Sequence, residues 1–171
     1  LAGWSTDRPV VGAAQEPDAS RSAMDRWILS RVAGLAVDAR TELADFDARS
    51  ATQAISTAID DLSTWYLRRS RRRFSRSDDA ADRDAAFGAL HLALVSIARI
   101  AAPILPFITD ELHAVLVKPV QPDAPESVHL TRWPDAELAP LRDPALEAAM
   151  ADLRRAVELG RTLRGQAGLK V

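Results

Sequence analysis

The chain has 171 residues, of which 47% are hydrophobic and 27% charged, and its formal net charge is -2. This composition is ordinary for a soluble globular domain, and the abundance of alanine, leucine and arginine favours helices over sheet. The sequence contains no cysteine, which excludes disulfides and thiolate metal sites. No run of about 18 apolar residues and no signal pattern stands out, so we expect a cytoplasmic protein that makes no membrane contact.

Residues 1–20 contain two glycines and two prolines without hydrophobic periodicity, which predicts an extended leader. The chain starts with Leu1 and ends on the apolar and basic run 168–171. We therefore expect a piece of a longer protein, in which residues 1–20 come from a preceding domain.

Hydrophobic periodicity of about 3.6 residues predicts helices over roughly 24–44, 48–74, 78–102, 107–117 and 143–165. Pro103 and Pro106 separate the third and fourth helices, because proline cannot donate a backbone hydrogen bond. Residues 119–141 hold five of the ten prolines and predict a loop whose segment 127–130 is strand-like. We expect an all-α antiparallel bundle of about five helices, with this Pro-rich excursion between helices four and five. Residues 21–118 would form its core, and residues 142–171 the last helix and the start of a junction.

Six of the nine residues in 68–76 are arginine, a segment that we call the arginine island. The other 162 residues carry a net charge of -8, so the island is not a background of scattered charge. Guanidinium groups suit planar, bidentate contacts with phosphate oxygens, which points to a nucleic acid. An ion-paired or solvated helix end is the alternative that charge alone leaves open.

Helical phasing adds a second argument. At 100° per residue, an apolar stripe is predicted to contain Ile55, Ile59, Leu62 and Tyr66. The same phase places Arg69 near this stripe and Arg73 on it. Either the helix runs past the core at this point, or these arginines meet buried acids.

No catalytic, cofactor or metal site is predicted. His91, His113 and His129 lie far apart in sequence, and the glycines are too scattered for a phosphate-binding loop. Trp27 is predicted to be a core residue, whereas Trp65 could serve either the core or base stacking. Trp133, before Pro134, is predicted to pin the Pro-rich loop onto the bundle. A second basic edge on the last helix is interpreted as a solvated face; it comprises Arg154, Arg155, Arg161 and Arg164.

Several segments resemble the anticodon-binding helical domain of the isoleucyl-tRNA synthetase family. The most specific is DLSTWYLRRSRRRF at 61–74, since the valyl and leucyl relatives usually lack it. DRWILSR at 25–31 and APILPFITDEL at 102–112 also match, as do SVHL with Trp133-Pro134 and the run 160–171. The resemblance covers about residues 24–171.

This resemblance implies a module that docks the anticodon arm of isoleucine tRNA during ATP-dependent aminoacylation by the parent ligase. The H-x-G-H and K-M-S-K-S signatures of the catalytic domain do not occur in this sequence, and neither the editing domain nor a zinc-binding tail is expected. We therefore expect an inactive, monomeric module whose partners are the tRNA and the catalytic domain of its own chain. The candidate RNA-binding residues are Trp65, Tyr66, Arg68, Arg69, Arg71, Arg72, Arg73 and Arg76.

A structural role is the competing hypothesis. The arginines would then brace the bundle or close ion pairs, and RNA contact would be made elsewhere. Acidic residues on both sides of the island are available as partners; these are Asp60, Asp61, Asp78 and Asp79.

Overall fold

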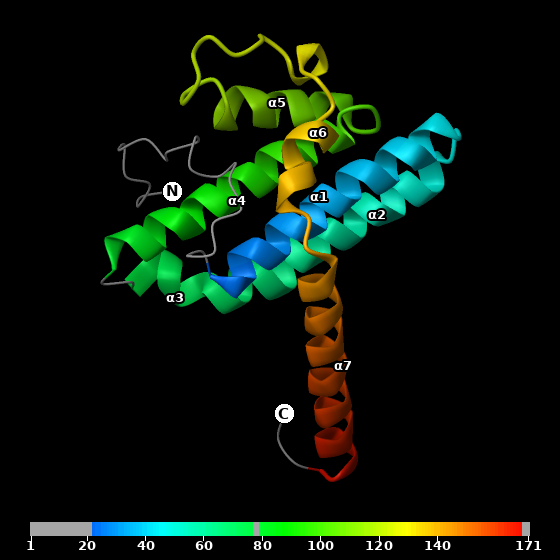
Figure 1. Cartoon of the computed structure of the whole chain (residues 1–171), viewed down its shortest axis with the longest axis vertical. Helices are drawn as coiled ribbons and strands as arrows, with labels where there is room; N and C mark the ends of the chain where they lie inside the picture. The colour runs from blue at the N-terminus through cyan, green and yellow to red at the C-terminus, as the bar shows by residue number, and fades with distance from the viewer. Residues whose placement is uncertain (1–21, 77–78, 169–171) are drawn as a thin grey trace.

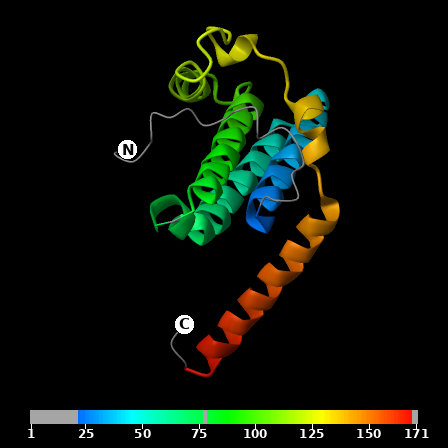
Figure 2. The same ribbon diagram turned by 60° about the vertical axis from the view of Figure 1, so that its left-hand side comes forward.

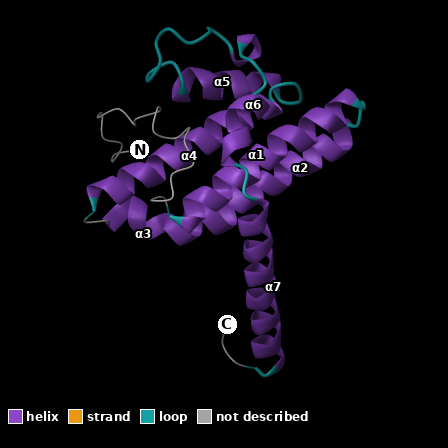
Figure 3. Ribbon diagram, in the orientation of Figure 1, coloured by secondary structure: helices purple, strands orange, loops and turns teal. Residues whose placement is uncertain are grey.

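The computed structural model describes residues 22–76 and 79–168, and all regular elements within them are helical (Figure 3). The predicted all-α class is confirmed, and the predicted long helices match the observed ones closely. Residues 1–20, predicted as a leader, lie outside the described residues. The α-helices are α1 (Ala23–Ala44), α2 (Ala48–Asp60), α3 (Arg68–Arg76), α4 (Ala80–Ala101), α5 (Pro106–Leu116), α6 (Asp135–Leu138) and α7 (Pro144–Gln166). A π-helical segment, η2 (Asp61–Leu67), joins α2 to α3, and two short 3-10 turns are η3 (Val128–Leu130) and η4 (Ala139–Leu141).

Four helices begin at a side chain that accepts a hydrogen bond from a free backbone N–H group. Ser22 accepts from the Asp25 amide at 3.1 Å, and Asp47 accepts from the Ser50 amide at 3.0 Å. Asp79 and Asp143 do the same for α4 and α7. Such caps satisfy donors that the helix cannot pair internally, so they explain why the helices start at these positions.

The core lies between α1, the continuous run α2–η2–α3, and α4, which lie side by side (Figure 1). The α1 and α2 helices run antiparallel through the short turn 45–47. Core side chains from all three include Trp27 on α1, Leu62 and Tyr66 on η2, and Ile100 on α4, each at most 5% exposed. Trp27 is therefore a core residue, as predicted.

The α4 helix is long and apolar enough, by length and composition, to cross a membrane. However, 50% of its apolar window is buried inside the protein, where it contacts α1, α3 and α5. It is thus one of the core helices of the bundle.

The Pro-rich excursion is fastened to α5 and α1 by side chains. Asp110 on α5 accepts hydrogen bonds from the Ser127 hydroxyl at 2.6 Å and the Val128 amide at 2.9 Å. The prediction of a strand-like piece at 127–130 is wrong, because the Val128 amide bonds to Asp110 and residues 128–130 close into a 3-10 turn. Trp133 donates its indole N–H to the Ala36 carbonyl at 2.8 Å, so it pins this loop to α1 as predicted.

The run from α2 to α3 departs from the predicted phase. Its buried residues continue from Leu62 to Tyr66 and then to Ser70, whereas Ile59 is 44% exposed and Arg69 is exposed. The predicted positions of Ile59 and Arg69 are therefore wrong. In a π-helix the hydrogen bonds reach one residue further than in an α-helix, so each turn holds more residues. The side chains that follow are therefore rotated backwards about the helix axis, compared with a regular α-helix. Ser70 thus occupies the inward position that regular phasing gave to Arg69.

The α7 helix leaves the bundle. Figures 1 and 2 show it running away from the other helices, and none of its residues is buried. Only its first half packs against the core, through Leu146 and Met150. Leu153, Leu159 and Leu163 are each more than half exposed.

Candidate nucleic-acid interface

The arginine island divides into an outward set and one inward residue. Arg68, Arg69, Arg71 and Arg72 on α3 are exposed, and within the described part of the chain they form no ion pair. The side chain of Arg76 lies outside what the structure describes. The four outward guanidinium groups therefore keep their hydrogen-bond donors free for an anionic partner.

Arg73 is directed into the protein, where it binds two acids. Its Nη1 and Nη2 donate to the two carboxylate oxygens of the fully buried Asp25, both at 2.8 Å. Its Nε donates to Asp82 at 2.9 Å. Hydrogen bonding to Asp25 raises the pKa of the Arg73 guanidinium, and hydrogen bonding from Arg73 lowers the pKa of the Asp82 carboxyl. The inward arginine predicted from phasing thus meets a buried acid.

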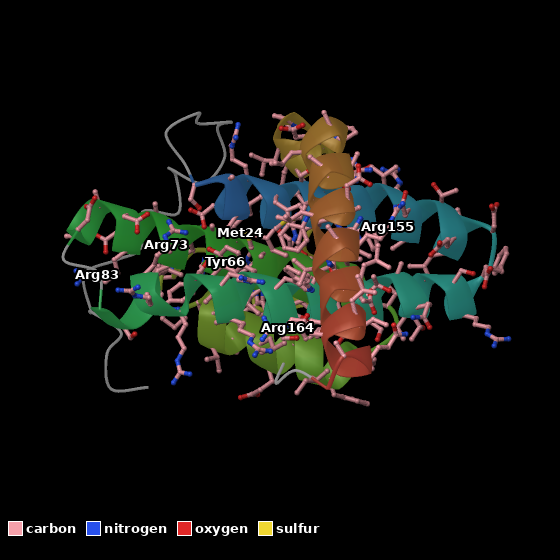
Figure 4. The ribbon with its side chains drawn as sticks, turned by 90° about the horizontal axis from the view of Figure 1, so that it is seen from below. Met24, Tyr66, Arg73, Arg83, Arg155 and Arg164 are labelled. Atoms are coloured by element: carbon pink, nitrogen blue, oxygen red, sulfur yellow. The ribbon has the colours of Figure 1, made fainter. Side chains whose placement is uncertain are left out.

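Tyr66 belongs to the same buried network. It is 0% exposed and its hydroxyl donates to Asp25 Oδ1 at 2.7 Å, while burial raises its pKa well above the ordinary value. Figure 4 shows Tyr66 and Arg73 close together beside α1. Neither residue is available for RNA, which corrects two of the predicted contacts: Tyr66 has no free ring face, and Arg73 neutralises Asp25.

Two of the four acids predicted as partners of the island, Asp60 and Asp61, do not bind it within the described part of the chain, and Asp78 lies outside that part. Asp60 is exposed, and Asp61 pairs with Arg31 on α1 and Arg154 on α7. Among the described residues, Asp25 and Asp82 bind the island through Arg73, because the chain folds α1 and α4 against α3.

A groove runs between the η2–α3 junction and α7. One hollow of about 330 Å³ is lined by Thr64, Trp65, Arg68, Arg69 and Arg161. A second, of about 540 Å³, is lined by Trp65, Arg154, Val157, Glu158, Arg161 and Thr162. Trp65 and Arg161 line both hollows, so the two form one surface, which we call the Trp65 groove. Its lining carries four arginines and one acid, so it is strongly positive.

Two guanidinium groups lie over the indole of Trp65. Arg69 is 5.2 Å and Arg154 4.9 Å from the ring centroid, distances typical of cation–π contacts. Arg154 also lies 5.8 Å from the ring of Trp27. The stacking surface of the groove therefore includes guanidinium planes as well as an aromatic ring, and both can stack on unpaired RNA bases.

The contribution of α7 was not predicted. Arg154 and Arg161 were interpreted as part of a solvated face, yet they form one wall of the groove. A buried acid at position 61 would have signalled a cationic partner such as Arg154, because a buried carboxylate needs a cation. Regular helical phasing of η2 did not place Asp61 in the interior, so the sequence did not reveal this signal. Among the described residues, no group of three or more His, Asp or Glu side chains could hold a metal ion.

A positively charged groove with stacking surfaces on a helical bundle is suited to binding a polyanion. The chain belongs to the family described as the anticodon-binding domain of tRNA ligase, which matches residues 25–171. Its relatives within this family include isoleucine–tRNA ligases, so the chain is similar to the anticodon-binding part of that ligase type. The predicted family is confirmed.

The similarity covers almost all of this chain but a small part of each relative. The chain is 42% identical to the isoleucine–tRNA ligase of Streptomyces avermitilis over 168 residues, which is 98% of the chain and 15% of that ligase. For the Thermobifida fusca enzyme the values are 44% identity, 99% and 15%, and for the Thermus thermophilus enzyme 42%, 96% and 16%. The chain thus spans about 15% of the length of the curated relatives it matches.

Proposed function

We propose that this domain docks the anticodon arm of isoleucine tRNA on the outward arginines of α3 and in the Trp65 groove. The carrying observation is that four exposed arginines of α3 form no ion pair with the described residues, and that two of them, Arg68 and Arg69, line a groove whose other wall is also basic. Phosphate contacts from Arg68, Arg69, Arg71 and Arg72 would position the RNA without reading its sequence. Unpaired loop bases would stack in the groove on Trp65 and the guanidinium groups beside it.

The parent protein would be a cytoplasmic ligase that uses ATP to join isoleucine to its tRNA. In that protein the catalytic domain of the same chain would be the second partner of this module. The module itself supplies no group for the reaction: its contribution is to hold the tRNA while the distant acceptor end reaches the active site.

A titration with isoleucine tRNA at several salt concentrations tests the proposal. If about four phosphates are contacted, the slope of log K against log salt should lie near -3 to -4. Changing Arg68 and Arg72 to Gln should make this slope shallower by about two and weaken binding at each salt concentration.

The matched control changes two exposed arginines elsewhere. Arg49 lies at the start of α2 and Arg132 in the excursion, and the pair alters the net charge by the same amount. We expect Arg49→Gln with Arg132→Gln to leave the slope unchanged. Equal slopes for the two double variants, with both proteins folded, would contradict a localised RNA surface and favour the structural bundle, with RNA contact made elsewhere.

A further inference from the structure

One of the polar attachments of α7 to the bundle is made by a buried acid that does not line the groove. Asp61 is 1% exposed and lies in the π-helical segment η2. Its Oδ2 accepts from Arg31 Nε of α1 at 3.0 Å, and its Oδ1 accepts from Arg154 Nη1 of α7. One carboxylate thus joins three elements, and both its oxygens are occupied by guanidinium groups.

Arg154 connects this ion pair to the groove. It lies midway along α7, and the guanidinium that Asp61 holds is the one that lies over Trp65. Beyond it, Val157, Glu158, Arg161 and Thr162 of the same helix line the groove. None of these residues is buried, so the place of this wall depends on how α7 is held at Arg154.

Other polar attachments of α7 lie at its beginning. The Asp143 amide donates to Ser30 Oγ at 2.7 Å, and Glu147 accepts from Ser30 and from Arg31. Contacts confined to the first turns locate the start of a helix but leave its direction free to vary. A contact further along, at Arg154, sets its direction.

We propose that Asp61 is a positioning residue: by holding Arg154 it sets the angle of α7 and thereby the width of the Trp65 groove. This inference rests on the proposed function for its link to RNA. Asp61 touches no RNA itself and acts through Arg154. Breaking a buried ion pair from one side leaves the other charge without its partner, so Asp61→Asn should release α7.

The absence of cysteine allows a direct measurement of the angle. Spin labels on Ser56→Cys of α2 and Leu163→Cys of α7, both exposed positions, report the distance between the bundle and the far half of α7. We expect one narrow distance distribution in the labelled parent and a shifted or broadened one in Asp61→Asn. The control is Asp60→Asn, which removes the same charge from the neighbouring exposed residue and should match the parent. Identical distributions for the two variants would overturn the proposal.

A variant on the other side of the ion pair covers the case in which Asp61→Asn fails to fold. Arg154→Gln removes the same contact from α7, and its effect on the distance is measured without RNA. An unchanged distance in folded Arg154→Gln would also overturn the proposal.

Titration with isoleucine tRNA then tests the link to RNA. Asp61→Asn should bind about tenfold more weakly and give a shallower salt slope, because the arginines of α7 no longer reach the RNA. A loss of stability alone would not change the slope. A released α7 with unchanged affinity would refute the link, whereas a parent chain without measurable tRNA binding would refute the proposed function and leave the distances to decide the role of Asp61.

Discussion

At the scale of residues, neighbouring arginines of the same island have opposite environments. Arg72 is exposed, whereas Arg73 neutralises the fully buried Asp25 and also binds Asp82. A buried carboxylate is tolerated only with a partner, so Arg73 is needed for folding. The outward arginines keep their charge available instead, as the proposed RNA contact requires.

This difference predicts contrasting effects of two adjacent substitutions. Arg73→Ala should lower the free energy of unfolding by about 3–5 kcal/mol, because Asp25 would remain charged and unpaired. Arg72→Ala, with the same charge change, should alter it by less than about 0.5 kcal/mol and weaken tRNA binding. Urea denaturation followed by circular dichroism measures both. Similar stability losses in the two variants would contradict the inward role of Arg73.

At the scale of elements, α7 is attached at few points and should open independently of the bundle. Ser30 on α1 is 0% exposed and bonds to both Asp143 and Glu147 at the start of α7. The remainder of α7 has no buried residue. Local opening is expected where buried apolar contacts are few, so α7 should exchange its amide hydrogens faster than α1.

Ser30→Ala should weaken this attachment by about 1–3 kcal/mol, because two partly buried polar groups, the Asp143 amide and the Glu147 carboxylate, lose a partner. Hydrogen exchange should rise in residues 144–155 and remain low in α1. The control is Ser56→Ala at an exposed position of α2, which should leave exchange in α7 unchanged. Faster exchange spread evenly over the bundle would instead indicate global destabilisation.

The excursion after α5 is a second independently attached element, and its attachment is sensitive to acid. Hydrogen bonds from Ser127 and Val128 lower the pKa of the Asp110 carboxyl. Because the pKa of Asp110 is lower in the folded state, its ionised form stabilises the fold at pH values above the ordinary pKa of about 3.9. This contribution is lost as the pH falls through the pKa of the folded state. Acid below about pH 4 should therefore release this segment.

We expect Asp110→Asn to make stability less dependent on pH between 6 and 3 than it is in the parent chain. Urea midpoints at the two pH values give the comparison. Asp123→Asn, an exposed acid in the same excursion, serves as the control and should retain the parent's dependence. If both variants respond to acid equally, Asp110 does not fasten the excursion.

Helix positions could be predicted from the sequence because caps, prolines and apolar periodicity are local signals. Asp143 with Pro144, for example, marks the start of α7 correctly. The partners of charged groups could not be predicted in this way: Asp61 and Arg154 are 93 residues apart, and only the fold brings them together. The π turn could not be predicted either, because its residues favour a regular α-helix equally well. The two kinds of winding differ only in which backbone groups are hydrogen-bonded.

At the scale of the whole molecule, a chain with a net charge of -2 gathers positive charge along one groove. Arg68 and Arg69 of α3 and Arg154 and Arg161 of α7 line this groove. Such an uneven distribution attracts a polyanion to one face while the acidic remainder repels it elsewhere. This charge distribution would thus begin to orient the RNA before the RNA touches the protein.

Binding should stabilise the whole fold by an amount that grows with the logarithm of the free tRNA concentration once this exceeds the dissociation constant. With free isoleucine tRNA at about 100 times its dissociation constant, the free energy of unfolding should rise by about 2.7 kcal/mol, if the unfolded chain does not bind. Denaturation followed by tryptophan fluorescence, at low and high salt, tests this expectation. The gain should disappear at high salt; a gain that persists there would contradict binding through phosphate contacts.

The π turn between α2 and α3 finally has a consequence for how this sequence can change over time. Upstream of Asp61 the helix is in register with the core, and downstream the register is rotated, so that Ser70 points inward and Arg69 outward. Loss of a single residue within Asp61–Leu67 would remove the extra residue that this turn accommodates and restore regular winding, with Ser70 still directed inward and Arg69 outward. The same loss within the regular helix on either side would rotate the following residues by about 100°. Chain length is therefore under looser constraint in the π turn than in the helices beside it.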